Sequence, residues 1–291
     1  MKKQKSVPFR EFFKQFPNDD ACLEHTMKAR YGLQHICRKC GREAKFYRIS
    51  SERAYACQFC GDHVHPCSGT LFENTHLPLQ LWFHAIYLFT NSRHGVPAKE
   101  LERQLGVPYK TAWRMGHQIR KHMAFVDGDE KLSGVVEVDE TMVGGVRKGK
   151  RGRGAAGKTV VFGMMEKDGD VMTKVVPNVK RKTLHPIIEA NVEKGTEIQS
   201  DELHSYKTLD RKGYSHKTVE HGAGEYVKGD THTNSIEGFW SRLKQSIGGT
   251  HVHVSPKHLS SYAGEFEYRY NSRKNAEKML PELLSTFPQA S

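Results

Sequence analysis

The chain has 291 residues, 37% of them hydrophobic and 10% aromatic, which is enough for one ordinary domain plus one or two small ones and excludes a globally disordered chain. Its 45 Lys and Arg residues outnumber its 33 Asp and Glu residues, and the net charge of +12 favours a polyanionic partner, because basic side chains displace counterions from phosphates. The longest apolar runs, such as LQLWFHAIYLF, are too short to span a bilayer and no apolar segment follows MKKQKSVPFR, so we expect a cytoplasmic protein without a membrane partner.

The N-terminal quarter predicts a helical segment over 1–30 followed by a small zinc ribbon over 31–75. Two CxxC pairs, CRKC and CQFC, stand sixteen residues apart and supply Cys37, Cys40, Cys57 and Cys60. Four thiolates complete a tetrahedral zinc site with no open position, so the ion is expected to be structural. The alternative is a set of reduced cysteines in a small core. Possible substitute ligands are Cys67, His63 and His65. Cys22 has no evident partner in the sequence.

Residues 76–130 predict helices, and PAKELERQLGVPYKTAWRMGHQIRKHM at 97–123 is typical of a helix-turn-helix. Gly106 ends the first helix, Val107 packs in the turn and Pro108 starts the second helix. The residues expected to face inward are Ala98, Leu101, Leu105, Ala112, Trp113 and Ile119. Those expected to face the major groove of double-stranded DNA are Lys110, Thr111, Arg114 and Gln118. A helical hairpin within a linker domain is the alternative.

From 131 to 285 strands and helices alternate. We expect strands at GVVEVDE, TVVFGMME, DVMTKVVPNV, TEIQSD and HKTVEH, and helices at TLHPIIEANVEK, ELHSYKTLDRKG, NSIEGFWSRLKQSIGG and a last helix that carries Leu259, Tyr262, Phe266 and Tyr270 on one stripe. This order matches an α/β, RNase H-like fold with a mixed sheet. The Gly-rich basic run between the first two strands cannot pack, so we expect it to bind DNA phosphates through Arg147, Lys148, Lys150, Arg151, Arg153 and Lys158.

Three acidic residues stand where such a fold could build a metal site. Asp139 breaks the alternation of buried valines on the first strand, Asp201 ends the fourth strand, and Glu237 lies in the first turn of the helix after the fifth strand. Carboxylates at this spacing suit two-metal phosphoryl transfer. Each has an ordinary alternative: a turn former at a strand end, a cap of the following helix, and half of a capping box with Asn234. Glu140 and Glu202 directly follow the two aspartates and compete with them.

Several separated blocks resemble one family. VEVDETMVGG, SDELHSY, HTNSIEGFWSRLK and GTHVHVSPKHLSSYAGEFEYRYN are similar to blocks of the ISXO2-like DDE transposases, the bacterial insertion-sequence group related to the eukaryotic Merlin elements. The thirty-five residues between Asp201 and Glu237 (202–236) fit the spacing of that class. The resemblance covers roughly 15–275, including the CxxC pairs and the helical stretch that follows them.

The resemblance implies an enzyme that binds the terminal inverted repeats of an insertion sequence, cuts them and joins the freed 3′-hydroxyls to target DNA. It implies two Mg²⁺ or Mn²⁺ ions held by Asp139, Asp201 and Glu237, with Asn234 as the alternative third residue, and an accessory Lys244 that holds DNA. It also implies a homo-oligomer on DNA, associated with the nucleoid. Two rival functions stay open: a zinc and helix-turn-helix transcription regulator, and an RNase H-like nuclease that never joins strands.

Overall fold

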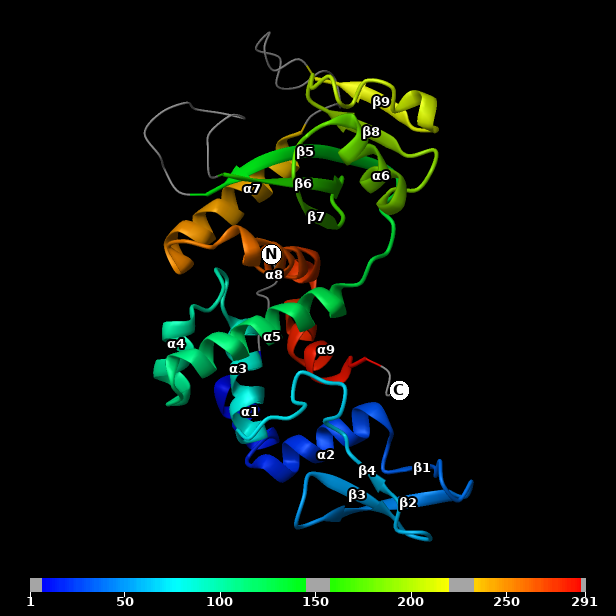
Figure 1. Ribbon diagram of the computed structural model, residues 1–291, viewed down its shortest axis with the longest axis vertical. Coiled ribbons are helices and arrows are strands. Elements are labelled where there is room, and N and C mark those ends of the chain that lie inside the picture. The colour runs from blue at the N-terminus through cyan, green and yellow to red at the C-terminus, as the bar shows by residue number, and fades with distance from the viewer. Residues whose placement is uncertain (1–6, 145–157, 220–232, 289–291) are drawn as a thin grey trace. The chain divides into compact units, whose positions relative to one another are not determined.

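The computed structural model describes residues 7–144, 158–219 and 233–288, and these form two compact units (Figure 1). Unit 1 comprises the chain up to Val126 and again from Ser272, and unit 2 comprises Asp127–Asn271. Unit 2 is therefore an insertion within the sequence of unit 1. Across the described residues, no helix is long and apolar enough to cross a membrane.

Unit 1 begins with two helices and a four-stranded antiparallel ribbon. The helices are α1 (Phe9–Gln15) and α2 (Asp19–Arg30), and the strands, in sheet order, are β1 (Gln34–Ile36), β2 (Glu43–Ile49), β3 (Ala54–Cys57) and β4 (His63–Val64). Of the N-terminal phenylalanines, Phe12 and Phe16 are buried while Phe9 is exposed, so only some of these aromatic side chains face the core. The expected N-terminal helical segment is two helices separated by a short turn.

Four more helices complete unit 1: α3 (Leu79–Asn91), α4 (Ala98–Leu105), α5 (Tyr109–Asp127), whose last residue crosses the boundary, and α9 (Met279–Ser285). Helix α9 buries Leu283 and Leu284, and the side chains of His122 and His25 reach the carbonyl oxygens of these two residues at 2.8 and 3.1 Å respectively. The expected catalytic range of 131–285 thus includes a helix that packs in the other unit.

Unit 2 is built on a five-stranded mixed sheet. Its strands are β5 (Val135–Val143), β6 (Thr159–Glu166), β7 (Val171–Val176), β8 (Glu197–Ser200) and β9 (Ser215–Thr218), in the order β7-β6-β5-β8-β9. The first three strands pair antiparallel, while β8 is parallel to β5 and β9 is parallel to β8. The first and fourth strands are neighbours, as the expectation of an RNase H-like fold requires, and that fold is confirmed.

Helices cover both faces of this sheet (Figure 1). They are α6 (Arg181–Asn191), α7 (Asn234–Ser246) and α8 (Leu259–Asn271). Side chains of a strand alternate between faces, so Val136 and Val138 pack with α6 on one face. On the other face Val161 and Met165 of β6 pack with α7 and α8. The predicted stripe of α8 is confirmed, since Leu259 and Phe266 are buried in this second core and both tyrosines pack against it.

One predicted helix is wrong. Residues 202–213 form turns and a single 3₁₀ turn (Asp210–Lys212) rather than a helix. The Asp201 carboxylate accepts a hydrogen bond from the Leu203 backbone N–H at 2.9 Å, which is a local turn that competes with helix formation. Gly213 does end the segment, in the left-handed conformation with φ 85°.

Candidate functional site

The two expected aspartates lie side by side. Strands β5 and β8 run parallel with Val138 opposite Ser200, so the residues that follow, Asp139 within β5 and Asp201 just after the end of β8, lie next to each other. Carboxylate oxygens of Asp139, Glu140 and Asp201 all lie within 4.8 Å of one another. The structure therefore adds Glu140, one of the two competing residues, to the pair, whereas Glu202 is exposed and outside this group.

Asp139 is fixed from the α7 side. Because the side chains of β5 alternate, Asp139 faces α7, on the opposite face of the sheet from Val136 and Val138. The expectation that Asp139 interrupts the buried row of valines is therefore wrong. The Trp240 indole Nε1–H donates to Asp139 Oδ2 at 3.0 Å. Gly163, opposite Asp139 on β6, makes room for this indole, since a Cβ there would lie 2.5 Å from Trp240 Cζ2.

The ionisation of Asp139 is strongly perturbed. Its pKa is raised to about 7, first by burial and then by the negative charges of Glu140 and Asp201, while the Trp240 hydrogen bond acts in the opposite direction. A bound divalent cation reverses this balance, because it stabilises the ionised carboxylates. A cluster of this kind is suited to a metal ion.

Glu140 is held from the other face of the sheet. The Tyr206 hydroxyl, which is fully buried, donates to Glu140 Oε2 at 2.7 Å. Burial, followed by the nearby charge of Glu140, raises the pKa of Tyr206 well above its usual value, so the phenol stays a donor. The sequence contained a signal for Glu140, namely its position beside Asp139, but that position alone could not distinguish it from Glu202.

Glu237 is not part of this group. Helix α7 begins at Asn234, and both Asn234 and Glu237 are exposed. The Thr233 hydroxyl donates to Glu237 Oε1 at 3.1 Å, and Thr233 is the N-cap residue. The alternative of a capping box with Asn234 at the N-cap is therefore wrong by one position, because the helix starts one residue earlier than that pattern requires. Glu237 is therefore outside the group whose carboxylate oxygens lie within 4.8 Å of one another, and it lies one turn before Trp240 on α7.

Lys244 and Lys158 extend the site with positive charge. Partial burial lowers the pKa of Lys244, the charge of Asp139 raises it and that of Lys158 lowers it, so both lysines act within electrostatic range of one another. Lys158 immediately precedes β6 and is exposed. The other basic residues expected to bind phosphates in this segment, 147–153, lie outside the described residues.

The α4–α5 pair has the local geometry of a helix-turn-helix. Gly106 ends α4 in the left-handed conformation, and Val107 is buried in the turn. Gly116 allows the close approach of α4, since a Cβ there would lie 3.4 Å from Leu101 Cδ1. Of the four residues expected to face outward, Lys110 and Arg114 are exposed, and Thr111 and Gln118 are partly exposed.

Trp113 corrects the expected inward face of α5. It is 37% exposed, and its ring lies 3.9 Å from that of His117, centroid to centroid. Tyr109, one turn earlier, is 45% exposed. Ala112 and Ile119, which were also expected to face inward, are fully buried, and Met115 is buried with them in place of Trp113.

The four ribbon cysteines form a compact cluster. The Sγ atoms of Cys37 and Cys60 lie 3.6 Å apart and those of Cys40 and Cys57 lie 4.0 Å apart, and all four sulfurs lie within 4.8 Å of one another. A tetrahedron with Zn–S of about 2.3 Å has sulfurs about 3.8 Å apart, so this set fits zinc.

The possible substitute ligands stay outside that cluster. Cys67 and Cys22 are buried, and burial raises the pKa of their thiols to about 11 and about 12. Buried neutral thiols of this kind are inert. His63 and His65 gather instead with Glu52, on the exposed side of the ribbon.

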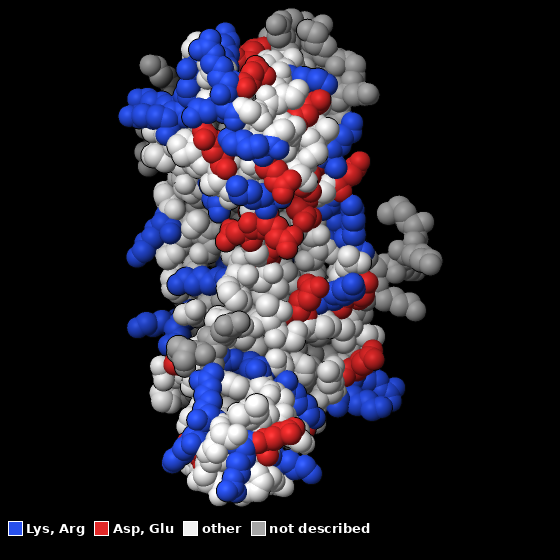
Figure 2. Space-filling model, turned by 90° about the vertical axis from the view of Figure 1, so that its right-hand side faces the viewer, with Lys and Arg blue, Asp and Glu red and all other residues white. Residues whose placement is uncertain are grey.

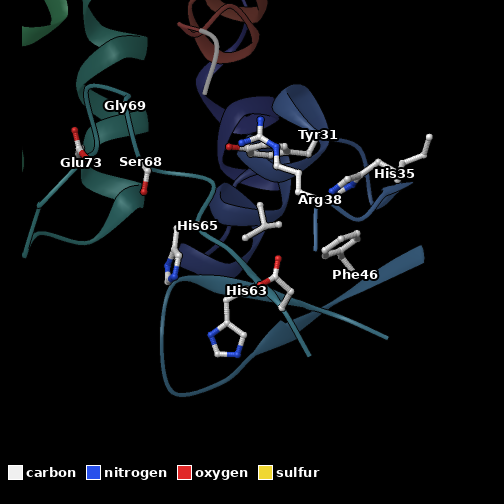
Figure 3. A pocket seen from close by; sticks show the side chains of 12 residues that line it. Tyr31, His35, Arg38, Phe46, His63, His65, Ser68, Gly69 and Glu73 are labelled. Carbon is white, nitrogen blue, oxygen red and sulfur yellow. The ribbon is translucent and has the colours of Figure 1, made fainter. Parts of the chain in front are cut away.

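A cavity of about 420 Å³ also opens in unit 1 beside the ribbon (Figure 3). Figure 3 shows His35 next to Phe46, and their rings stack 4.0 Å apart. No member of the Asp139 cluster lines this cavity, so it is separate from the candidate catalytic site.

The charged side chains on the face drawn in Figure 2 do not mark a single binding surface for DNA. In Figure 2, Lys and Arg side chains are spread along this face of the molecule and Asp and Glu side chains lie among them. Basic and acidic side chains are therefore interspersed on this face.

Comparison with known proteins finds transposase families in two parts of the chain. Residues 131–271 match the ISXO2-like transposase domain family, and residues 17–63 match the transposase zinc-ribbon domain family. An uncharacterized protein in transposable element ISH50 of Halobacterium salinarum is 27% identical over 260 residues, 82% of this chain and 85% of that protein. An uncharacterized transposase-like protein of Haemophilus influenzae is 31% identical over 102 residues, 35% of this chain and 81% of that protein.

A solved structure, a pre-cleavage Mos1 transpososome, covers 70% of this chain and 79% of its own chain at 12% identity. Its TM-score of 0.29 is too low to support an argument. The sequence families and relatives carry the assignment, together with the paired cysteines and the clustered aspartates: this chain is a member of the ISXO2-like insertion-sequence transposases.

Proposed function

We propose that this transposase cuts DNA at the ends of its insertion sequence and joins the freed 3′-hydroxyls to target DNA, using Asp139 and Asp201 as the central metal ligands. The observation that carries the proposal is the meeting of these two carboxylates, from segments far apart in sequence, at the C-terminal end of β8. Trp240 and Tyr206 hold the cluster from the two faces.

The donor set fits Mg²⁺ or Mn²⁺, because carboxylate oxygens are the hard ligands these ions prefer. Two bound ions would activate the attacking oxygen and stabilise the leaving 3′-oxygen. In the proposal Glu237 is the third residue of the site, and its first-turn position on α7 places it on the helix that supplies Trp240. Lys244, near Asp139, holds a DNA phosphate beside the carboxylates.

Recognition of DNA is assigned to unit 1 and to the basic segment. Helix α5 carries no Asp or Glu before Asp127, and it exposes Lys110 and Arg114, with Thr111 and Gln118 partly exposed. These residues suit a recognition helix in the major groove, with the structural zinc of the ribbon stabilising the fold next to it. We also propose that the active species is a homo-oligomer assembled on the two element ends.

The test uses labelled DNA that carries the ends of the element. Asp139→Asn and Asp201→Asn should each lower cutting and joining by at least about a hundredfold, because an amide replaces a charged ligand, and should leave end binding nearly unchanged. Asp129→Asn, at an exposed carboxylate of the same unit, is the control. If the wild-type protein cut this DNA without joining it, the nuclease alternative would be supported. If it bound the DNA without cutting it, the regulator alternative would be supported.

The same assay decides the third residue. Glu237→Gln should abolish cutting while Asn234→Ala should not, since only the first removes a carboxylate. Loss of activity in Asn234→Ala alone would assign the role to the amide and leave Glu237 as a residue of the helix start, bonded to Thr233.

A further inference from the structure

Helix α7 begins without a capping side chain of its own. Its N-cap residue Thr233 makes no side-chain hydrogen bond to the first-turn amides. The first four N–H groups of a helix have no partner inside the helix, and leaving them buried and unpaired is costly. Something else must therefore satisfy the start of α7.

Glu137 of β5 does so from about a hundred residues earlier in the chain. Its Oε2 accepts hydrogen bonds from the backbone N–H groups of Ser235 and Ile236, both at 3.0 Å. Glu137 is fully buried. This carboxylate oxygen thus meets the positive end of the helix dipole and two of the donors that the helix itself leaves unpaired.

These two hydrogen bonds lie close to the candidate site along β5. Glu137 and Asp139 face α7 from the same side of β5, two residues apart, and Asp139 is bonded to Trp240 of the same helix. Helix α7 is thus fastened to β5 at two points, Ser235–Ile236 and Trp240. Glu237 lies between them, so the rotation of its turn is fixed relative to Asp139.

We propose that Glu137 is a positioning residue that holds the first turn of α7, and with it Glu237, in register with Asp139. The inference rests on the proposed function for its effect on cutting, but the contact itself does not. It does not make Glu137 a metal ligand, since Glu137 is not a member of the carboxylate cluster.

The test compares three variants. Glu137→Leu removes the charge and the acceptor, whereas Glu137→Gln retains an acceptor oxygen of the same reach. The matched control is Glu265→Gln, because Glu265 is an equally buried carboxylate of unit 2 but pairs with Arg269 at 2.7 Å within α8. All three variants disturb a buried polar contact, so a loss of thermal stability alone does not distinguish them.

The first readout is hydrogen exchange of the metal-free protein, which needs no activity. In Glu137→Leu the amides of 234–238 should exchange at least about tenfold faster while those of β5 and β6 stay protected. Glu137→Gln should restore most of this protection, and Glu265→Gln should leave α7 unchanged. Unchanged exchange at the start of α7 in Glu137→Leu would overturn the inference. Should Glu137→Leu fail to fold, Glu137→Ala, which also removes the acceptor, replaces it, and unchanged exchange at the start of α7 in that variant would equally overturn the inference.

The second readout is the Mn²⁺ concentration that half-saturates DNA cutting. It should rise about tenfold in Glu137→Leu, with end binding unchanged, and stay at the wild-type value in Glu265→Gln. An equal rise in both variants would mean that Glu137 only stabilises the fold. An active Asp139→Asn protein would instead refute the proposed function, and the exchange result would still decide the role of Glu137.

Discussion

Strand β5 carries most of the chemistry of unit 2 at the scale of single residues. Because its side chains alternate, Glu137 and Asp139 face α7 while Glu140 faces the side on which Tyr206 lies. One strand therefore presents a helix anchor, the proposed central metal ligand and a second carboxylate within four positions. The neighbouring parallel strand contributes only Asp201 to the cluster.

Glu140 and Glu202 provide a direct residue-scale comparison, since each follows one of the two aspartates. Only Glu140 lies within the cluster and is held by Tyr206. Glu140→Gln should raise the Mn²⁺ concentration needed for half-maximal thermal stabilisation by roughly tenfold, because it removes a charge next to the ion. Glu202→Gln should leave this value unchanged. Identical metal titrations for the two variants would show that Glu140 only orders the buried tyrosine.

The sequence predicted Asp139 and Asp201 because strand ends that are neighbours in a sheet bring their next residues together. The sequence could not predict the surroundings of Glu237 or the role that we propose for Glu137. Their environments depend on how α7 docks on the sheet, which is a contact between positions about a hundred residues apart. Local spacing carries no information about such a contact.

At the scale of elements, prediction succeeded where one face of an element is clearly apolar. The strands of unit 2 and the stripe of α8 are confirmed. It failed at 202–213, where a side chain to backbone turn at Asp201 replaces the helix, and at Trp113, where a large aromatic residue lies on the exposed side. In both cases a local interaction outweighed the hydrophobic pattern.

The ribbon is an element whose stability should depend on its metal. Its strands have two to seven residues, too short to form a stable sheet without a further crosslink. Cys57→Ser should reduce zinc from about one ion per chain to near zero and expose the amides of β2 and β3 to exchange. Elemental analysis and hydrogen exchange measure both effects. Cys67→Ser, at a thiol outside the cluster, should retain the zinc; a folded ribbon in zinc-free protein would contradict the prediction.

For the whole molecule, the main feature is that unit 2 is inserted between α5 and the C-terminal segment of unit 1. The two ends of unit 2 are joined, because the Asn271 side-chain amide donates to Asp127 Oδ2 at 3.0 Å and to the Val171 carbonyl at 3.0 Å. An insertion closed in this way can be added to a host without separating the host's two segments. The linear order of motifs did not reveal it, since α9 follows the last family block without a break in pattern.

Buried carboxyls near this junction make the stability of unit 2 depend on pH. Burial raises the pKa of Glu267 from 4.5 to about 7, while its hydrogen bonds with Thr173 act in the opposite direction and the charge of Asp127 adds to the rise. Burial likewise raises the pKa of Asp127 to about 7. A raised pKa means that the stabilising protonated form is fully present below about 4.5, and that its contribution is lost as the pH rises through about 7.

Glu267→Gln should therefore stabilise the protein above neutrality. The amide oxygen can still accept from the Thr173 N–H and hydroxyl, which bond to Glu267 Oε2 at 2.7 and 2.6 Å, but it carries no charge to bury. The gain should be near zero at pH 4.5 and reach about 1–3 kcal/mol at pH 8, since each pKa unit corresponds to about 1.4 kcal/mol. Urea unfolding of metal-free protein across this range measures it, with exposed Glu193→Gln as the control. A gain of the same size at pH 5 and pH 8 would show that packing, and not the proton held by Glu267, separates the variant from the wild type.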